Sequence, residues 1–131
     1  LRFSSNRPLY LPSTELSFPH MFLQQHTLQQ EVALEGPGLH TGASCTVTVR
    51  PAPENHGFRF RRTDLPGQPV IPANIDHVVE LSRSTTIGVG EAKVHTVEHL
   101  LAALTGMQVD NALIDIDGPE LPILDGSARD Y

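Results

Sequence analysis

The chain has 131 residues, of which 39% are hydrophobic and 18% are charged, and this composition is typical of one globular domain rather than of a disordered chain. The formal net charge is −6 and the basic residues cluster only between Arg59 and Arg62, which argues against a nucleic-acid-binding protein. No apolar run approaches the roughly 20 residues that a transmembrane helix requires, so we expect no transmembrane segment.

The first 20 residues differ from the rest of the chain. They contain three prolines and four serines and show no periodic pattern. We expect residues 1–20 to be a leader or a disordered extension, because no pattern in them indicates a packed element. Met21 directly precedes the first strand-like segment and is a candidate start of the domain, which would span residues 21–131.

Alternation of apolar and polar residues predicts a series of strands from about Thr27 onward. The runs 27–35 and 43–52 flank the Gly/Pro-rich stretch "GPGLHTG", so we expect an antiparallel pair joined by a specialised loop. Further strands are expected in "GFRFRR", in one or two parts of residues 71–88, and in "NALIDIDGPE". The arginines of "GFRFRR" alternate with phenylalanines, and we interpret them as a solvated strand face rather than a phosphate or partner site.

The only cysteine, Cys45, lies in one of these alternating runs. A single cysteine excludes an internal disulfide framework, and its place in a strand favours a buried structural thiol over a nucleophile. We therefore expect a reducing, cytoplasmic environment.

The stretch "KVHTVEHLLAALTG" (residues 93–106) predicts a strand end that runs into a short helix. Thr96 is the expected N-cap and Gly106 the expected stop. At 100° per residue, one apolar stripe faces the core and a second face carries the ionisable groups. The apolar stripe is Val97, Leu100, Leu101 and Leu104, and the second face is His95, Glu98, His99 and Ala102. With one clear helix and about four to six strands, we predict an α+β domain with a helix on a mostly antiparallel sheet.

The same stretch contains H-x-x-E-H, a pattern known from zinc hydrolases. If Thr96 caps the helix, His95 stays in the incoming strand, and His95 and His99 do not form an i, i+4 pair. Glu98 keeps a suitable position for a base and His99 for a metal ligand. A catalytic Zn²⁺ needs about three protein ligands, and no spacing in this chain completes the set. Either the other ligands lie beyond Tyr131 or there is no metal.

The last residues predict the beginning of a second helix. Ser127 and Asp130 have the spacing of a capping box, after a turn at Asp125 and Gly126. One helical turn is not stable alone, so we expect the chain to be a fragment of a longer protein.

Three stretches together resemble the N-terminal half of the UDP-3-O-acyl-N-acetylglucosamine deacetylases, zinc enzymes of lipid A biosynthesis. They are "GPGLHTG", "RPAPENHGFRFRRTDL" and "HTVEHLLAALTGMQVDNALIDIDGPELPILDGSA". The resemblance implies two similar α+β domains of the ribosomal S5 domain 2-like kind, each a two-layer sandwich with helices packed on one face of the sheet. This chain would be the first domain, without the second. The implied partners are the UDP-sugar lipid precursor and the second domain of the same protein.

The resemblance also implies roles for particular residues. Glu98 would be the general base and His99 one zinc ligand, while a histidine and an aspartate in an H-x-x-x-D pattern, and an assisting lysine and histidine, would belong to the second domain. His40, Ser82 and Thr85 would border the substrate site or support its architecture. His95 receives no ligand role, and Asp125 is interpreted as a turn residue. The chain alone is expected to be inactive and to bind zinc weakly.

Two alternatives remain open from the sequence. One is a fragment of an inverted-motif zinc protease built on His95, Glu98 and His99, which needs a further acidic ligand downstream. The other is a non-catalytic binding module of the same fold. The sequence that follows Tyr131 would distinguish the deacetylase from both the protease fragment and the non-catalytic module.

Overall fold

The computed structural model describes residues 3–5, 24–129 and 131. Strand β1 (Phe3–Ser5) pairs antiparallel with β2 (His26–Leu28). The remainder of the expected leader or extension in residues 1–20, and the candidate start at Met21, lie outside the described residues.

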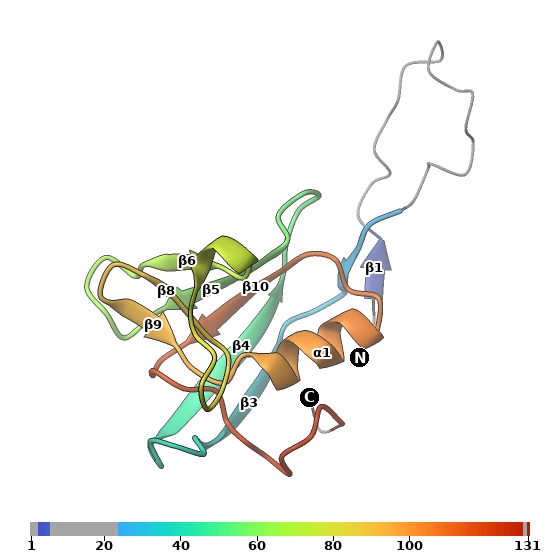
Figure 1. Cartoon of the computed structure of the whole chain (residues 1–131). Helices are drawn as coiled ribbons and strands as arrows, with labels where there is room; N and C mark the ends of the chain where they lie inside the picture. The colour runs from blue at the N-terminus through green and yellow to red at the C-terminus, as the bar shows by residue number, and fades with distance from the viewer. Residues whose placement is uncertain (1–2, 6–23, 130) are drawn as a thin grey trace.

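A mixed five-stranded sheet forms the centre of the domain (Figure 1). Three of its four strand pairs are antiparallel, and only β10 and β5 run parallel. The strand order is β3 (Val32–Pro37), β4 (Ser44–Pro51), β10 (Ala112–Ile116), β5 (Phe58–Arg62) and β6 (Val70–Pro72). The expected antiparallel pair around "GPGLHTG" is β3 and β4, and the expected strands in "GFRFRR" and "NALIDIDGPE" are β5 and β10.

The run 27–35 is interrupted, contrary to the prediction of one strand. Gln29 and Gln30 form a bend, and the segment before them leaves the five-stranded sheet to pair with β1. The hydroxyl of Thr27 donates to the Asn111 carbonyl at 2.6 Å, which holds this segment beside the start of β10.

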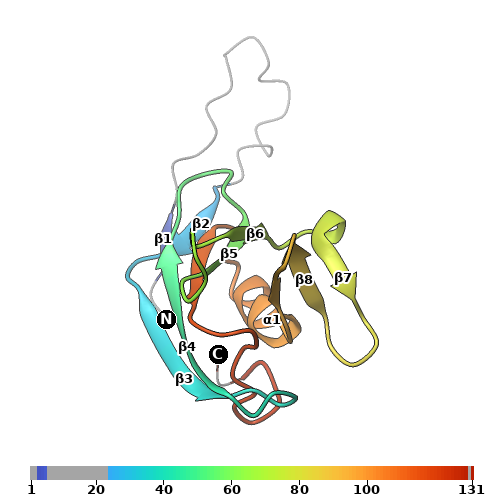
Figure 2. The same cartoon turned by 90° about the vertical axis from the view of Figure 1, so that its left-hand side faces the viewer.

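Helix α1 (Glu98–Gly106) covers one face of the five-stranded sheet (Figure 2). Alternate residues of the strands point toward the helix, and they are buried because the helix excludes water from that face. The fully buried side chains of this core include Val47, Phe60, Ile114, Ile116 and Val97. The domain is therefore mostly β, with one α-helix on a mostly antiparallel sheet among the described residues.

A smaller antiparallel sheet stands beside β5 and β6. It consists of β7 (Val78–Glu80), β8 (Thr86–Val89) and β9 (Ala92–Val94), and a 3-10 turn at Ile75–His77 precedes it. Strand β9 leads directly into α1, so this small sheet sets where the helix begins.

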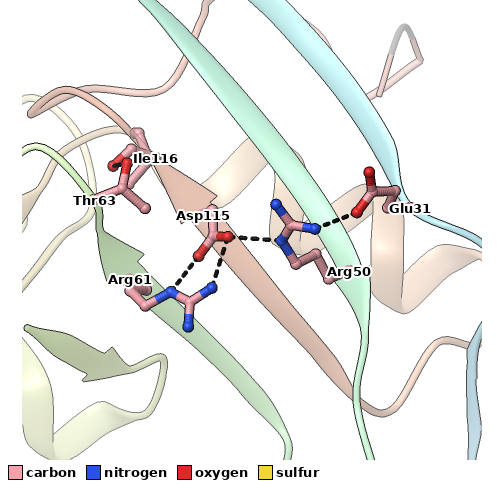
Figure 3. Close-up of polar contacts among 6 residues, drawn as sticks. All are labelled: Glu31, Arg50, Arg61, Thr63, Asp115 and Ile116. Carbon is pink, nitrogen blue, oxygen red and sulfur yellow. Dashed lines mark hydrogen bonds and ion pairs between the residues drawn. The ribbon is translucent and has the colours of Figure 1, made fainter. Parts of the chain in front are cut away.

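The other face of the five-stranded sheet carries an ion-pair network (Figure 3). Arg61 donates two hydrogen bonds to the carboxylate of Asp115, at 2.6 and 2.8 Å, and Arg50 donates one at 2.7 Å. Arg50 also binds Glu31. The arginine face is thus ion-paired rather than simply solvated, and Arg62 is buried on the opposite face, where it binds Asp64 and the Lys93 carbonyl.

We expect Asp115→Asn to lower the free energy of unfolding by about 1–3 kcal/mol near neutral pH. Burial raises the pKa of Asp115, but the hydrogen bonds from Arg61 and Arg50 outweigh it and hold that pKa below its usual value. The stabilisation is therefore complete above the unfolded-state pKa of about 3.9 and is lost as the pH falls through the lower folded-state pKa.

Urea unfolding of both proteins, from about pH 6 down to about pH 3, checks this prediction. The difference between wild type and Asp115→Asn should shrink as the pH falls. Asp76, exposed in the 3-10 turn, offers a matched control, because Asp76→Asn should change stability by less than about 0.5 kcal/mol. If the difference in the free energy of unfolding between wild type and Asp115→Asn did not depend on pH, the stabilisation could not come from the ionised Asp115 carboxylate.

Candidate functional site

The start of α1 differs from the predicted cap. Thr96 is not the N-cap: its φ is 62°, in the left-handed region, and the helix begins at Glu98 with Val97 as N-cap. The Thr96 hydroxyl donates to the Glu120 carboxylate at 2.9 Å instead of to the helix backbone. His95 lies before the helix, in a parallel bridge with Glu120, so His95 and His99 are not an i, i+4 helical pair, as predicted.

The two faces of α1 largely follow the predicted division. Val97, Leu100 and Leu104 are buried in the core and Leu101 is half-buried. On the other face, Ala102 is exposed, and His95, Glu98 and His99 are half-buried. The helix ends at Gly106, where the sequence predicted its stop.

Thr85 and Glu98 meet at the start of the helix. The Thr85 backbone N–H donates to Oε2 of Glu98 at 3.1 Å, and the Val97 N–H donates to the Thr85 carbonyl at 3.2 Å. The loop between β7 and β8 therefore orients the Glu98 carboxylate. Ser82 is exposed in the same loop, and its hydroxyl donates to Glu80 at 2.7 Å rather than to the helix.

A cleft of about 210 Å³ opens between this loop and the loop that joins β3 to β4. It brings His40 together with His95, which are far apart in the sequence. One nitrogen of the His95 ring, Nδ1, lies 2.9 Å from the Thr86 hydroxyl. The residues that line the cleft are His40, Thr41, Glu80, Arg83, Ser84, Thr86 and His95.

Glu120 is the main residue that the sequence reasoning missed. Its side chain is 1% exposed, and its carboxylate accepts the backbone N–H groups of His40 and Thr41 as well as the Thr96 hydroxyl. Burial raises the pKa of Glu120, but these donors outweigh it and lower the pKa below its usual value. The only signal in the sequence is a glutamate between Pro119 and Leu121, in an otherwise apolar stretch.

Cys45, which is buried, and Tyr131, which is half-buried, both have raised pKa values. Burial, with the nearby Asp117 and Glu120, raises the pKa of Cys45 to about 11, and the Cys45 thiol donates to the Glu120 carbonyl. Burial, with Cys45 and Glu98 nearby, raises the pKa of Tyr131 to about 12, and its hydroxyl binds the Pro122 carbonyl. Cys45 is therefore a structural thiol, as predicted, because its thiolate is disfavoured.

The turn residues near the end of the chain were only partly predicted. Asp125 accepts hydrogen bonds from the N–H and the hydroxyl of Ser127, at 2.8 and 2.7 Å, which confirms its role in a turn. Residues 124–129 form turns and bends, so the helix expected from Ser127 does not form there, and Asp130 lies outside the described residues. The Asp125 and Ser127 hydrogen bonds close a turn here instead, and the first turn of a helix is costly to nucleate.

The residues at the start of α1 fit only part of a metal site. His99 offers one imidazole on the face of the helix that the core does not use. Across residues 3–5, 24–129 and 131, no group of three or more histidine, cysteine or acidic side chains could hold a metal ion. Since a catalytic zinc needs about three protein ligands, the described residues do not supply a complete set.

Comparison with known proteins identifies what this arrangement resembles. Residues 25–131 match the family model described as "LpxC: UDP-3-O-acyl N-acetylglycosamine deacetylase". The chain is 57% identical over 111 residues to the bifunctional enzyme LpxC/FabZ of Chlorobaculum tepidum, covering 85% of this chain and 24% of that protein. It is 53% identical over 109 residues to the UDP-3-O-acyl-N-acetylglucosamine deacetylase of Trichormus variabilis, covering 83% and 39%.

The match to the Bacteroides thetaiotaomicron LpxC/FabZ enzyme is similar, at 52% identity over 83% of this chain and 24% of the relative. The chain thus spans between about a quarter and two fifths of the length of these curated relatives. Within the described part of the chain, no helix is long and apolar enough to cross a membrane.

Proposed function

Because the chain belongs to the LpxC family, UDP-3-O-acyl N-acetylglycosamine deacetylase, we propose that it forms the first domain of a cytoplasmic, zinc-dependent hydrolase. The proposed substrate is UDP-3-O-acyl-N-acetylglucosamine, a UDP-sugar precursor of lipid A, from which the enzyme removes acetate. The observation that carries the proposal is the family match over residues 25–131, which includes the adjacent pair Glu98 and His99 at the start of α1.

The proposed architecture is the ribosomal S5 domain 2-like two-layer sandwich, with a second domain of the same protein completing the site. Two observations support it. The helix lies on one face of a mostly antiparallel sheet, and its front end presents Glu98 and His99 away from the core. The absence of a group of three metal-ligating side chains among the described residues agrees with a site shared between two domains.

We assign Glu98 the role of general base. Its carboxylate is oriented by the Thr85 N–H, and it takes a proton from water as the water oxygen bonds to the acetamide carbonyl carbon. That proton then passes to the sugar nitrogen as the carbon–nitrogen bond breaks, which gives acetate and a free amine. His99 would hold Zn²⁺ together with ligands from elsewhere, and zinc when bound lowers the pKa of water and polarises a carbonyl.

An assay of acetate release tests the proposal. The full-length protein that contains this chain, loaded with zinc, should release one acetate for each free amine formed from UDP-3-O-acyl-N-acetylglucosamine. The chain of residues 1–131 by itself should show no turnover. Absence of acetate release by the zinc-loaded full-length protein would overturn the function, and turnover by residues 1–131 alone would overturn the need for a second domain.

A further inference from the structure

We propose that Glu120 is a positioning residue, which fixes the direction in which Glu98 and His99 enter the site by holding both Thr96 and the His40 loop. This inference rests on the proposed function, because it concerns the same site. It is carried by the contacts of one buried carboxylate with two segments that are more than 50 residues apart in the sequence.

The environment of Glu120 is unusual for an acidic side chain. It is 1% exposed, and no ion pair among residues 24–129 and 131 includes it. Its charge is balanced by neutral donors: the Thr41 N–H at 2.8 Å, the His40 N–H at 3.1 Å and the Thr96 hydroxyl at 2.9 Å. Burying a charge is costly unless donors compensate for it, and these three donors tie the carboxylate to both segments at once.

The first of its partners, Thr96, has a strained backbone. A β-branched residue at φ 62° is an outlier, because the left-handed region is costly for such a side chain. Thr96 is held there on both sides: its hydroxyl binds Glu120, and the preceding His95 forms backbone hydrogen bonds with Pro119 and Leu121, at 2.8 and 3.2 Å.

This strained residue is where the chain changes direction from β9 into α1. Val97 already has helical angles, so the change of direction falls at Thr96, and the Val97 N–H then donates to the Thr85 carbonyl. The conformation of Thr96 therefore sets the axis along which Glu98 and His99 are presented. If Thr96 relaxed toward an ordinary conformation, both side chains would move together.

The second partner is the loop that carries His40. The carboxylate of Glu120 binds two consecutive N–H groups of this loop, and Gly38 leaves the room for it, because a Cβ at Gly38 would lie 2.3 Å from Oε2 of Glu120. The loop lines one wall of the cleft, and His95 and Thr86 line another. One carboxylate thus fixes the separation of two walls of the cleft.

The test compares Glu120→Gln, Thr96→Val and the double variant in the full-length, zinc-loaded protein. Glutamine keeps the size of Glu120 and loses the charge, and valine keeps the shape of Thr96 and loses the hydroxyl. We expect kcat to fall by about 10- to 100-fold in Glu120→Gln, with KM changed by less than about 2-fold and zinc content unchanged. The double variant should be little worse than Glu120→Gln, because both changes break the same contact.

The matched control is Asp117→Asn. Asp117 lies three residues earlier on the same segment, is exposed, and accepts the Thr46 N–H at 2.7 Å rather than any group at the start of α1. It should leave kcat unchanged. Two results would overturn the proposal. One is a folded Glu120→Gln with an unchanged kcat. The other is a double variant whose loss in kcat equals the product of the losses in the two single variants.

Two further outcomes are separated by other measurements. If Glu120→Gln does not fold, Thr96→Val alone decides: a lower kcat supports the proposal and an unchanged kcat overturns it. If the wild-type protein releases no acetate, the proposed function fails, but the positioning is still read from backbone amide chemical shifts. Shifts in Glu120→Gln that reach from Thr96 to His99, and are absent in Asp117→Asn, support the proposal, and shifts confined to residues 119–121 contradict it.

Discussion

Replacing Glu98 by glutamine in the full-length protein is expected to lower kcat for deacetylation by about 10²- to 10⁴-fold, because the amide cannot take a proton from water. The amide oxygen of glutamine can still accept the Thr85 N–H that binds Oε2 of Glu98 at 3.1 Å. The variant should therefore keep its fold and its zinc content, and the loss should appear in kcat rather than in KM.

The comparison is made with Glu91→Gln, which changes an exposed carboxylate in the turn between β8 and β9. Its kcat should equal that of the wild type. Initial rates of acetate release, normalised to bound zinc, provide the measurement. If Glu98→Gln retained a tenth or more of the wild-type kcat (a loss below about 10-fold), Glu98 would not be the base.

Replacing His99 by alanine is expected to weaken zinc binding by the full-length protein by at least about 100-fold, because a direct ligand contributes at least as much as the residues that orient ligands. The variant should be purified with much less than one zinc per chain and with activity reduced in proportion. Zinc titration with a fluorescent competitor measures the affinity directly.

His56→Ala is the matched control, because His56 is also half-buried but binds the Gly57 carbonyl in the loop between β4 and β5. It should leave zinc affinity unchanged. His95→Ala should change it only modestly, since His95 precedes the helix and lies beside Thr86. Loss of zinc in His95→Ala as severe as in His99→Ala would favour the inverted-motif protease instead.

The sequence was sufficient to predict the elements whose pattern is local. Alternation identified β4, β5 and β10, and the helical stripe of Val97, Leu100 and Leu104 identified α1 and its core-facing side. These patterns arise because each element buries one face, so apolar residues recur in the sequence with the period of the strand or helix.

The sequence was not sufficient where a contact joins distant segments. Thr96 looks like a helix cap because threonine favours that position, but its hydroxyl binds Glu120, 24 residues away, and its backbone is left-handed. Arg62 is the same residue type as Arg59 and Arg61, but it is buried and donates to the Lys93 carbonyl, 31 residues away. Glu120 cannot be identified from spacing as the partner of Thr96, because the fold brings the two together only in three dimensions.

The position of β10 has a consequence for the order of folding. This strand lies at the centre of the five-stranded sheet, yet it is the last of the five in the chain, and it pairs with β4 on one side and β5 on the other. The two hairpin halves of the sheet therefore cannot join until Ala112–Ile116 inserts between them, a late step that closes long loops. Because Glu120 follows β10 by four residues, the cleft around His40 is expected to take its final shape only in that last step, whether on the ribosome or during refolding.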